Sequence, residues 1–193
     1  PTGIPLRRAW LHTSVTDADG VILFESGKSD ESGRLVDQSG TVLPSERVGG
    51  PTLAHVDRVT SSASVPVYEG VMADGAGAAT FLLLRGEGWV KDNRLLPQGF
   101  DPGEAVEGGI AAVGVDGDAD FVGGGDAVHY QVTVGDALQA LSIEVELLYQ
   151  PLSARWAAEL FASGTPEALA FQAMYEAADR TPELVSSTRA DVR

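Results

Sequence analysis

Two acidic loops hold the residues whose types and spacing come closest to a recognisable chemistry. Asp17 and Asp19 alternate in one loop, and Asp116, Asp118 and Asp120 alternate in the other. Aspartates at alternate positions beside glycine can bind calcium, because this hard cation prefers several carboxylate and carbonyl oxygens. Neither loop has the glycine and glutamate spacing of an EF-hand. The alternative is a solvated acidic turn, since aspartate and glycine are also the residues that turns favour.

The histidines His12, His55 and His129 are the candidates for acid–base or nucleophilic catalysis. Such catalysis needs a histidine to meet a hydroxyl and an acid in space, which spacing along this chain does not show. The chain has no Gly-x-Ser-x-Gly elbow and no His-Glu-x-x-His zinc motif. We therefore expect that the chain is not an enzyme. An enzyme with a site of another kind is the hypothesis that we rank third, after two non-catalytic ones.

Composition excludes several classes of protein. The chain has 193 residues, a formal net charge of −15 and no cysteine. Without cysteine it has no thiol nucleophile, disulfide or iron–sulfur ligand, and it cannot attach haem c through a C-x-x-C-H motif. Its strong acidity excludes nucleic acid as a partner, because phosphate contacts need clustered Lys and Arg. No run approaches the roughly 18 apolar residues of a membrane span.

One polar segment keeps side chains that the rest of the chain avoids. Asn93 is the only asparagine, and Lys91 is one of two lysines. Together with Asp92 and Arg94 they follow the apolar Trp89-Val90 and precede a Pro–Gly turn region. We expect a structured loop in which Asp92 and Asn93 bond nearby backbone amides. Lys91 and Arg94 are expected to pair with acids.

The elements that must position these residues are mostly strands. Residues 8–15 and 21–24 flank a turn that ends at Gly20, which predicts a hairpin. Residues 128–134 and 141–149 alternate apolar and polar side chains, as half-exposed antiparallel strands do. The three tryptophans, Trp10, Trp89 and Trp156, are expected in the core, with an aromatic platform for sugars as the alternative.

The C-terminal third changes to a helical pattern. Helix formers over residues 153–163 precede Gly164, and Thr165-Pro166-Glu167 then starts a second helix that runs to about Asp179. Leu184-Val185 is expected as a short edge strand before frayed residues. The whole pattern predicts a mainly β fold, an antiparallel β-sandwich forming a single domain over residues 1–193. A C-terminal helical pair at about 153–179 packs on it.

Several motifs resemble a known family. The segment PTGIPLRRAWLH at residues 1–12 resembles the P-T-G-x-P-x-R-R-x-W-L-H pattern of a domain C-terminal to the haem-binding regions of multihaem c-type cytochromes. Residues 67–72 (VYEGVM) and 91–97 (KDNRLLP) are similar to its Y-E-x-V-M and K-D-N-R-L-L-P motifs. Residues 147–150 (LLYQ), followed by the helix with Arg155-Trp156, also look similar.

The resemblance implies a domain that adjoins a haem-bearing region but does not itself bind haem. It suggests a non-catalytic accessory or docking domain of a multihaem cytochrome electron-transfer system, periplasmic or extracellular. This chain would carry no cofactor, while haem c would lie on a neighbouring region or a partner subunit. The start at Pro1, without Met or a signal-peptide pattern, is read as a piece of a longer chain. Arg7, Arg8 and His12 would contact the haem region or partner, or Arg7 and Arg8 would form an ordinary surface pair.

The leading hypothesis is therefore the accessory domain. The second is a ligand-binding β-sandwich for carbohydrate or calcium, motivated by the tryptophans and the two acidic loops. The sequence specifies neither the redox partner nor the oligomeric state.

Overall fold

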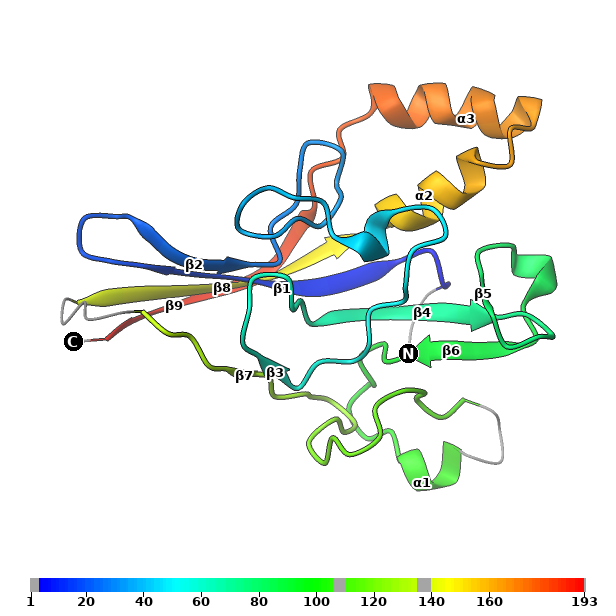
Figure 1. Cartoon of the computed structure of the whole chain (residues 1–193). Coiled ribbons are helices and arrows are strands. Elements are labelled where there is room, and N and C mark those ends of the chain that lie inside the picture. The colour runs from blue at the N-terminus through cyan, green and yellow to red at the C-terminus, as the bar shows by residue number, and fades with distance from the viewer. Residues whose placement is uncertain (1–3, 106–109, 135–139, 193) are drawn as a thin grey trace.

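The computed structural model describes residues 4–105, 110–134 and 140–192. Its strands are mainly antiparallel and form one large sheet, with two helices near the C-terminus (Figure 1). The expected fold class, a mainly β antiparallel fold with a C-terminal helical pair, is confirmed.

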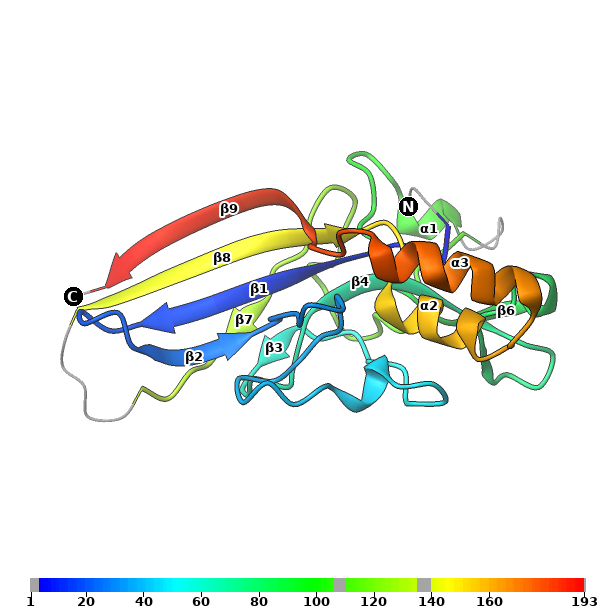
Figure 2. The same cartoon turned by 90° about the horizontal axis from the view of Figure 1, so that it is seen from above.

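The central strand of the seven-stranded sheet is β1 (Arg8–Thr16). On one side it pairs along its whole length with β8 (Leu141–Gln150). On the other side it pairs first with β4 (Val67–Ala73) and then with β2 (Ile22–Ser26). Three strands extend the sheet: β5 (Ala79–Thr80) and β6 (Gly88–Asp92) beside β4, and β9 (Glu183–Val192) beside β8. Figure 2 shows β9, β8, β1 and β2 side by side in this order.

The turn between β1 and β2 confirms the expected hairpin. Asp17 Oδ1 accepts hydrogen bonds from the backbone N–H groups of Asp19 and Val21, at 3.0 and 2.9 Å. Gly20 has a φ of +80°, a conformation that glycine adopts without steric cost. The Asp17 carboxylate therefore closes the turn.

Side chains of β1 alternate between hydrophobic clusters on its two faces. Trp10 is fully buried with Leu35 and Leu43 on one face. Val15 packs with Phe24 on the other face. A third cluster contains Tyr68, Leu96 and Phe121. Because both faces of β1 are covered, chain segments must pack above and below the sheet.

A two-stranded sheet forms the layer below, on the side of the large sheet opposite the helices (Figure 1). It consists of β3 (Arg58–Val59) and β7 (His129–Tyr130), and the pair is parallel. The antiparallel strand expected over residues 128–134 is thus limited to two residues. The side chains of Val132 and Val134 still pack on the cluster around Val15, which explains their alternation without a neighbouring strand.

Two helices cover the other side, as the sequence predicts. They are α2 (Ala154–Phe161) and α3 (Pro166–Ala177), and Ser153 and Thr165 cap their N-termini through their side-chain oxygens. The rings of Phe161, Phe171 and Tyr175 pack between the helices. Shorter helical segments are η1 (Pro44–Glu46), η2 (Leu83–Arg85) and α1 (Pro102–Ala105). No helix in the described ranges combines the length and apolarity needed to cross a membrane.

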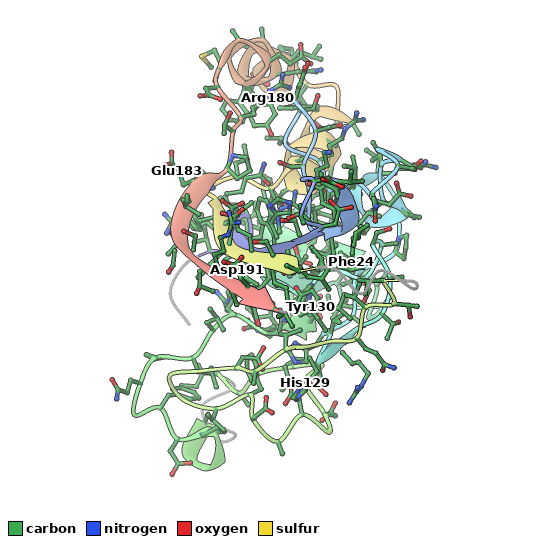
Figure 3. All side chains as sticks on the ribbon, turned by 90° about the vertical axis from the view of Figure 1, so that its left-hand side faces the viewer. Phe24, His129, Tyr130, Arg180, Glu183 and Asp191 are labelled. Carbon is green, nitrogen blue, oxygen red and sulfur yellow. The ribbon has the colours of Figure 1, made fainter. Side chains whose placement is uncertain are left out.

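The last strand is longer than expected. In place of a short strand at Leu184-Val185 with frayed residues after it, β9 runs for ten residues and pairs antiparallel with β8. It forms the margin of the sheet from Glu183 to Asp191 (Figure 3). The sequence of β9 does not alternate apolar and polar residues clearly. Its strand conformation therefore depends on the backbone hydrogen bonds that the free edge of β8 offers.

Arg8 lies in the core, so the alternative that it forms an ordinary surface pair with Arg7 is wrong. Its guanidinium bonds both carboxylate oxygens of Glu46, at 2.6 and 3.0 Å. It also donates to Gln150 Oε1 at 2.9 Å and to the Gly33 carbonyl at 3.1 Å. The side chains of Arg8 and Glu46 are each only 2% exposed. This buried pair joins β1 to η1 and to the end of β8.

The buried pair leads to a first prediction. Arg8→Met leaves the Glu46 carboxylate buried and uncompensated, so the free energy of unfolding should fall by about 3–5 kcal/mol. Urea denaturation measures this loss. Arg34→Met is the control, because its ion pair with Asp30 is partly exposed and should contribute at most about 1 kcal/mol.

A double variant tests the physical cause. Replacing both Arg8 and Glu46 by Met removes both buried charges, and should recover most of the stability lost in Arg8→Met. A double variant no more stable than the single one would contradict the role assigned to the uncompensated charge.

Candidate functional site

Each of the three histidines lies beside carboxylates. His12 Nδ1 is 2.8 Å from a carboxylate oxygen of Glu146, and its Nε2 is 3.2 Å from one of Glu25. His55 and His129 lie in the lower layer, in two clusters of mixed histidine and aspartate side chains. These two clusters are the strongest candidates for a functional site.

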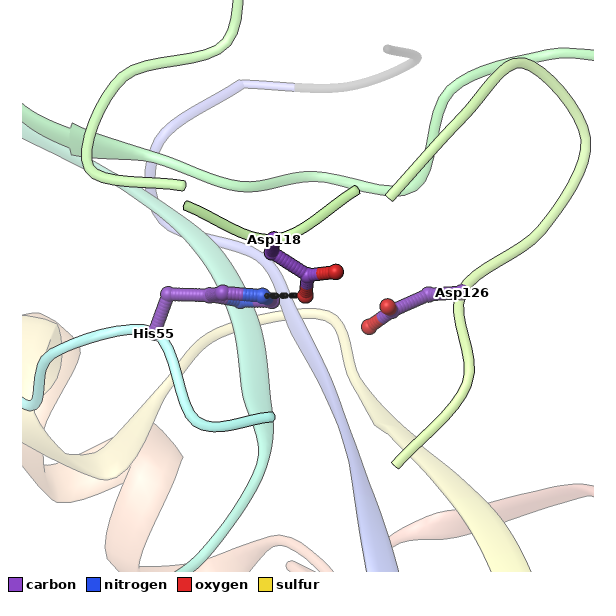
Figure 4. Close-up of side chains that lie close together, drawn as sticks. All are labelled: His55, Asp118 and Asp126. Atoms are coloured by element: carbon purple, nitrogen blue, oxygen red, sulfur yellow. Dashed lines mark hydrogen bonds and ion pairs between the residues drawn. The ribbon is translucent and has the colours of Figure 1, made fainter. Parts of the chain in front are cut away.

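The inner cluster consists of His55, Asp118 and Asp126 (Figure 4). His55 Nε2 lies 2.7 Å from Asp118 Oδ2, and these two side chains are 6% and 5% exposed. Asp126 Oδ2 accepts a hydrogen bond from the Tyr68 hydroxyl at 2.6 Å. The His55 ring also packs edge-on against Phe121. The cluster is therefore a largely buried network.

Asn93 sets the proton position on His55. Asn93 Oδ1 accepts from the Glu69 backbone N–H, and its Nδ2 donates to the Val67 carbonyl at 2.9 Å. These backbone partners fix the orientation of the amide, so the Nδ2 group must also be the donor to His55 Nδ1, 3.0 Å away. The proton of a neutral His55 ring is then on Nε2, from which it is donated to Asp118.

The two aspartates of the inner cluster have pKa values displaced in opposite directions. Burial by itself raises the pKa of Asp118, but hydrogen bonds from His55 and from the Asp120 and Phe121 amides lower it below the usual 3.8. Burial raises the pKa of Asp126 above 3.8, and the hydrogen bond from Tyr68 offsets only part of this rise. The network thus favours an ionised Asp118 beside an Asp126 that is harder to ionise.

The outer cluster consists of Asp57, Asp120 and His129. One ligand atom from each residue lies within 4.8 Å of the other two. Asp57 is half-buried, whereas Asp120 and His129 are exposed. Each residue lies two or three positions after a member of the inner cluster, so the same three segments supply both clusters.

Within the described residues, the aspartates of neither acidic loop come together as a set of their own. Asp17 closes the β1–β2 turn, and neither it nor Asp19 belongs to a potential ligand cluster in the described residues. Asp116 is exposed and outside both clusters. Asp118 and Asp120 separate, one into each cluster, because the chain bends at residues 119 and 120, where the Asp120 N–H donates to Asp118 Oδ1, instead of continuing as an extended segment. No pattern along the chain indicated that histidines would complete the two sets.

The segment from Lys91 to Arg94 forms the expected structured unit, although Lys91 and Asp92 belong to β6. Lys91 Nζ donates to the Val67 carbonyl and to Glu69, at 2.8 and 3.3 Å. Arg94 forms an ion pair with Asp92 at 2.6 Å. Burial lowers the pKa of Lys91, and the charge of Glu69 opposes this change. These side chains connect β4 to β6.

Of the three tryptophans expected in the core, Trp10 is buried, whereas Trp89 and Trp156 are half-buried. Trp10 is fully buried and donates to the Gly27 carbonyl at 2.8 Å. An open groove of about 710 Å³ lies beside α2, where Arg155 stacks over Phe81. This groove and four smaller pockets of the described chain are lined by no histidine. Arg7, which is exposed, lines one of the smaller pockets beside Arg94.

Comparison with known proteins supplies no relative. No family model matches the chain, and neither a curated protein nor a solved structure is significantly similar to it. The function must therefore be argued from the residues and their geometry.

The orientation of Asn93 leads to a second prediction. Asn93→Asp replaces the donor to Val67 and His55 by an acceptor, and should destabilise the fold by roughly 2–5 kcal/mol through unmade hydrogen bonds. Urea denaturation measures the change. Gln38→Glu is the matched control, since the exposed Gln38 side chain only accepts, from the Glu25 amide, and a carboxylate can still do so. Equal losses in the two variants would contradict the assignment.

The opposed pKa displacements lead to a third prediction. Ionised Asp118 stabilises the fold, so its contribution is complete above the usual pKa of 3.8 and is lost as the pH falls through the lowered value. Asp126 favours the protonated form, so its contribution is complete below 3.8 and is lost as the pH rises through the raised value.

The corresponding asparagine variants should therefore differ in sign. Relative to the native chain, Asp118→Asn should lose stability at about pH 7 and lose less at about pH 3. Asp126→Asn, which can still accept from Tyr68, should gain stability as the pH rises between the same limits. Urea midpoints at the two pH values measure both differences. Parallel changes in the two variants would contradict the opposed pKa directions.

Proposed function

We propose that this chain is a non-catalytic accessory domain that docks a haem-bearing c-type cytochrome region or subunit, by accepting an extended segment of it at the free edge of β9. Haem c belongs to that partner, and the complex lies in the periplasm or outside the cell. The kind of partner and the location are inferred from the motif resemblance alone. The docking mode is inferred from the exposed edge of β9.

This edge lacks three of the features that often protect the margin of a sheet, namely Pro, Lys and a short length. All ten residues of β9 are exposed, and its only strand partner in the described chain is β8. Proteins commonly protect edge strands with Pro, with Lys, or by making them short. The segment from Glu183 to Val192 contains neither residue and is long. Such an edge can form main-chain hydrogen bonds with an added strand.

The charge of β9 also permits a close approach. The chain as a whole has a net charge of −15, but β9 carries only Glu183, Arg189 and Asp191 as ionisable residues. Arg189 and Asp191 lie 3.5 Å apart and partly neutralise one another. A partner segment therefore meets less repulsion here than an average surface of this chain would exert.

Docking is tested with two neighbouring proline variants, Ser187→Pro and Thr188→Pro. Successive residues of an antiparallel strand direct their N–H groups alternately to the two sides, so one substitution removes a donor to β8 and the other an edge donor. The variant that keeps the native thermal midpoint is the edge variant. It should bind a purified multihaem c-type cytochrome of the same organism at least about tenfold more weakly than the native chain.

Co-elution of haem absorbance with the chain, followed by titration calorimetry, provides the measurement. Leu84→Lys is the control, because Leu84 is fully exposed in η2 and outside β9, and it should leave binding unchanged. Failure of the native chain to bind the cytochrome, or equal binding by the edge variant, would sink the proposal.

A further inference from the structure

The outer cluster provides an inference that is independent of docking. We propose that Asp57, Asp120 and His129 form a binding site for a divalent transition-metal cation of the zinc type. One nitrogen and two carboxylate ligands leave a fourth position to water, as in zinc sites that keep an open coordination position.

Backbone structure holds the three ligands close together without a metal. The His129 N–H donates to the Asp57 carbonyl at 2.7 Å, where β3 and β7 begin to pair. Asp120 Oδ1 accepts from the Ala127 N–H at 3.2 Å, which joins the third segment to the residues before β7. The ligand atoms, all within 4.8 Å of one another, are thus supplied by segments that are already bonded to each other. The backbone segments that carry the ligands therefore need little rearrangement on binding.

The cluster lacks the compensation that carboxylates normally have. Asp57 Oδ1 is buried and has no hydrogen-bond partner among the described residues. Within the same part of the chain, neither Asp57 nor Asp120 forms an ion pair with Lys or Arg, although Arg58 is aligned with His129 in the strand register. A cation bound here would satisfy this buried oxygen, for which no donor exists among the described residues, and would lie between two carboxylates.

Among the described residues, buried carboxylate oxygens without a hydrogen-bond partner occur only at these two clusters. Of the buried side-chain atoms without a partner in the described residues, the carboxylate oxygens belong to Asp57 and Asp126. Asp126 has a second oxygen bonded to Tyr68. No hydrogen bond of the described chain involves the Asp57 carboxylate, so Asp57 is the member with its coordination capacity fully available.

The inner cluster is a poorer metal site although its members are equally close. A histidine that binds a metal through one ring nitrogen usually donates a proton from the other. His55 Nδ1 instead accepts from Asn93, so binding through Nε2 would require a doubly deprotonated ring. No hydrogen bond of the described residues involves the ring of His129, which leaves it able to ligate through one nitrogen.

The ligand types select the metal. Calcium prefers six to eight oxygen ligands, and imidazole is a poor substitute for them. Imidazole and carboxylate together suit zinc and neighbouring divalent metals. The exposure of Asp120 and His129 gives a cation direct access from solvent. In Figure 3 His129 lies on the lower side of the molecule, below Tyr130.

The test uses Zn²⁺ and Co²⁺ with the whole chain. Titration calorimetry should show binding of one Zn²⁺, and Co²⁺ should develop visible d–d absorption that Zn²⁺ abolishes. The thermal midpoint should rise with Zn²⁺ by linkage, and Ca²⁺ at the same concentration should change it much less. These readouts do not depend on any partner protein, so failure of the docking proposal leaves them unaffected.

Variants assign the ligands. His129→Gln and Asp57→Asn should each weaken Zn²⁺ binding at least about tenfold. Tenfold is the lower end of the loss in metal affinity when a residue that only orients a ligand is replaced, so loss of a ligand should cost at least as much. Asp116→Asn is the matched control, since Asp116 is exposed in the same acidic loop and outside both clusters, and its binding should match that of the native chain. Far-UV circular dichroism verifies that the variants fold.

Two outcomes overturn the proposal. One is the absence of calorimetric heat, Co²⁺ absorption and thermal stabilisation in the native chain. The other is metal binding that Asp116→Asn weakens as much as His129→Gln does, because the acidic loop rather than the mixed cluster would then hold the cation.

Discussion

The fold depends on one constraint, that the central strand β1 buries side chains on both of its faces. Trp10 and Val15 occupy different hydrophobic clusters, so neither face can be left to solvent. Segments from distant parts of the chain form the two covering layers, with α2 and α3 on one side and the β3–β7 pair on the other. Arg8, on the same strand, adds a charge that must be compensated inside the core by Glu46. Without cysteines, the chain relies on this burial and on buried polar contacts for its cohesion.

Buried polar groups do much to hold the irregular lower layer. Loops of this kind form few regular backbone hydrogen bonds with one another. Side chains must therefore bond the backbone N–H and C=O groups that remain unpaired. Asn93 and Lys91 both donate to the Val67 carbonyl, and Asn93 also orients His55. His55 in turn bonds Asp118, which is 63 residues away in the chain. The polar network therefore joins the large sheet to the loops that carry the two clusters.

The same segments supply one cluster to the fold and another to the surface. The inner set, His55 with Asp118 and Asp126, is occupied by hydrogen bonds and contributes to stability. Two or three residues further along lies the outer set, in which Asp120 and His129 are exposed and the buried Asp57 Oδ1 has no hydrogen-bond partner among the described residues. The free edge of β9 is a separate surface, formed because the sheet ends there. Metal binding and strand docking are therefore proposed for different parts of the molecule.

The sequence by itself determined the features that depend on local periodicity and capping. Alternation identified β8, helix formers with Thr165 and Gly164 identified the helical pair, and the turn at Gly20 identified the hairpin. The side-chain bonding expected for Lys91 to Arg94 also followed from residue type. Only the tertiary structure decided that Arg8 is internal, that β9 extends to Val192, and that the acidic loop at Asp118 divides between two histidines. The reason is that these outcomes depend on which distant segments meet, and the spacing of residues along one segment carries no information about the segment that will pack against it.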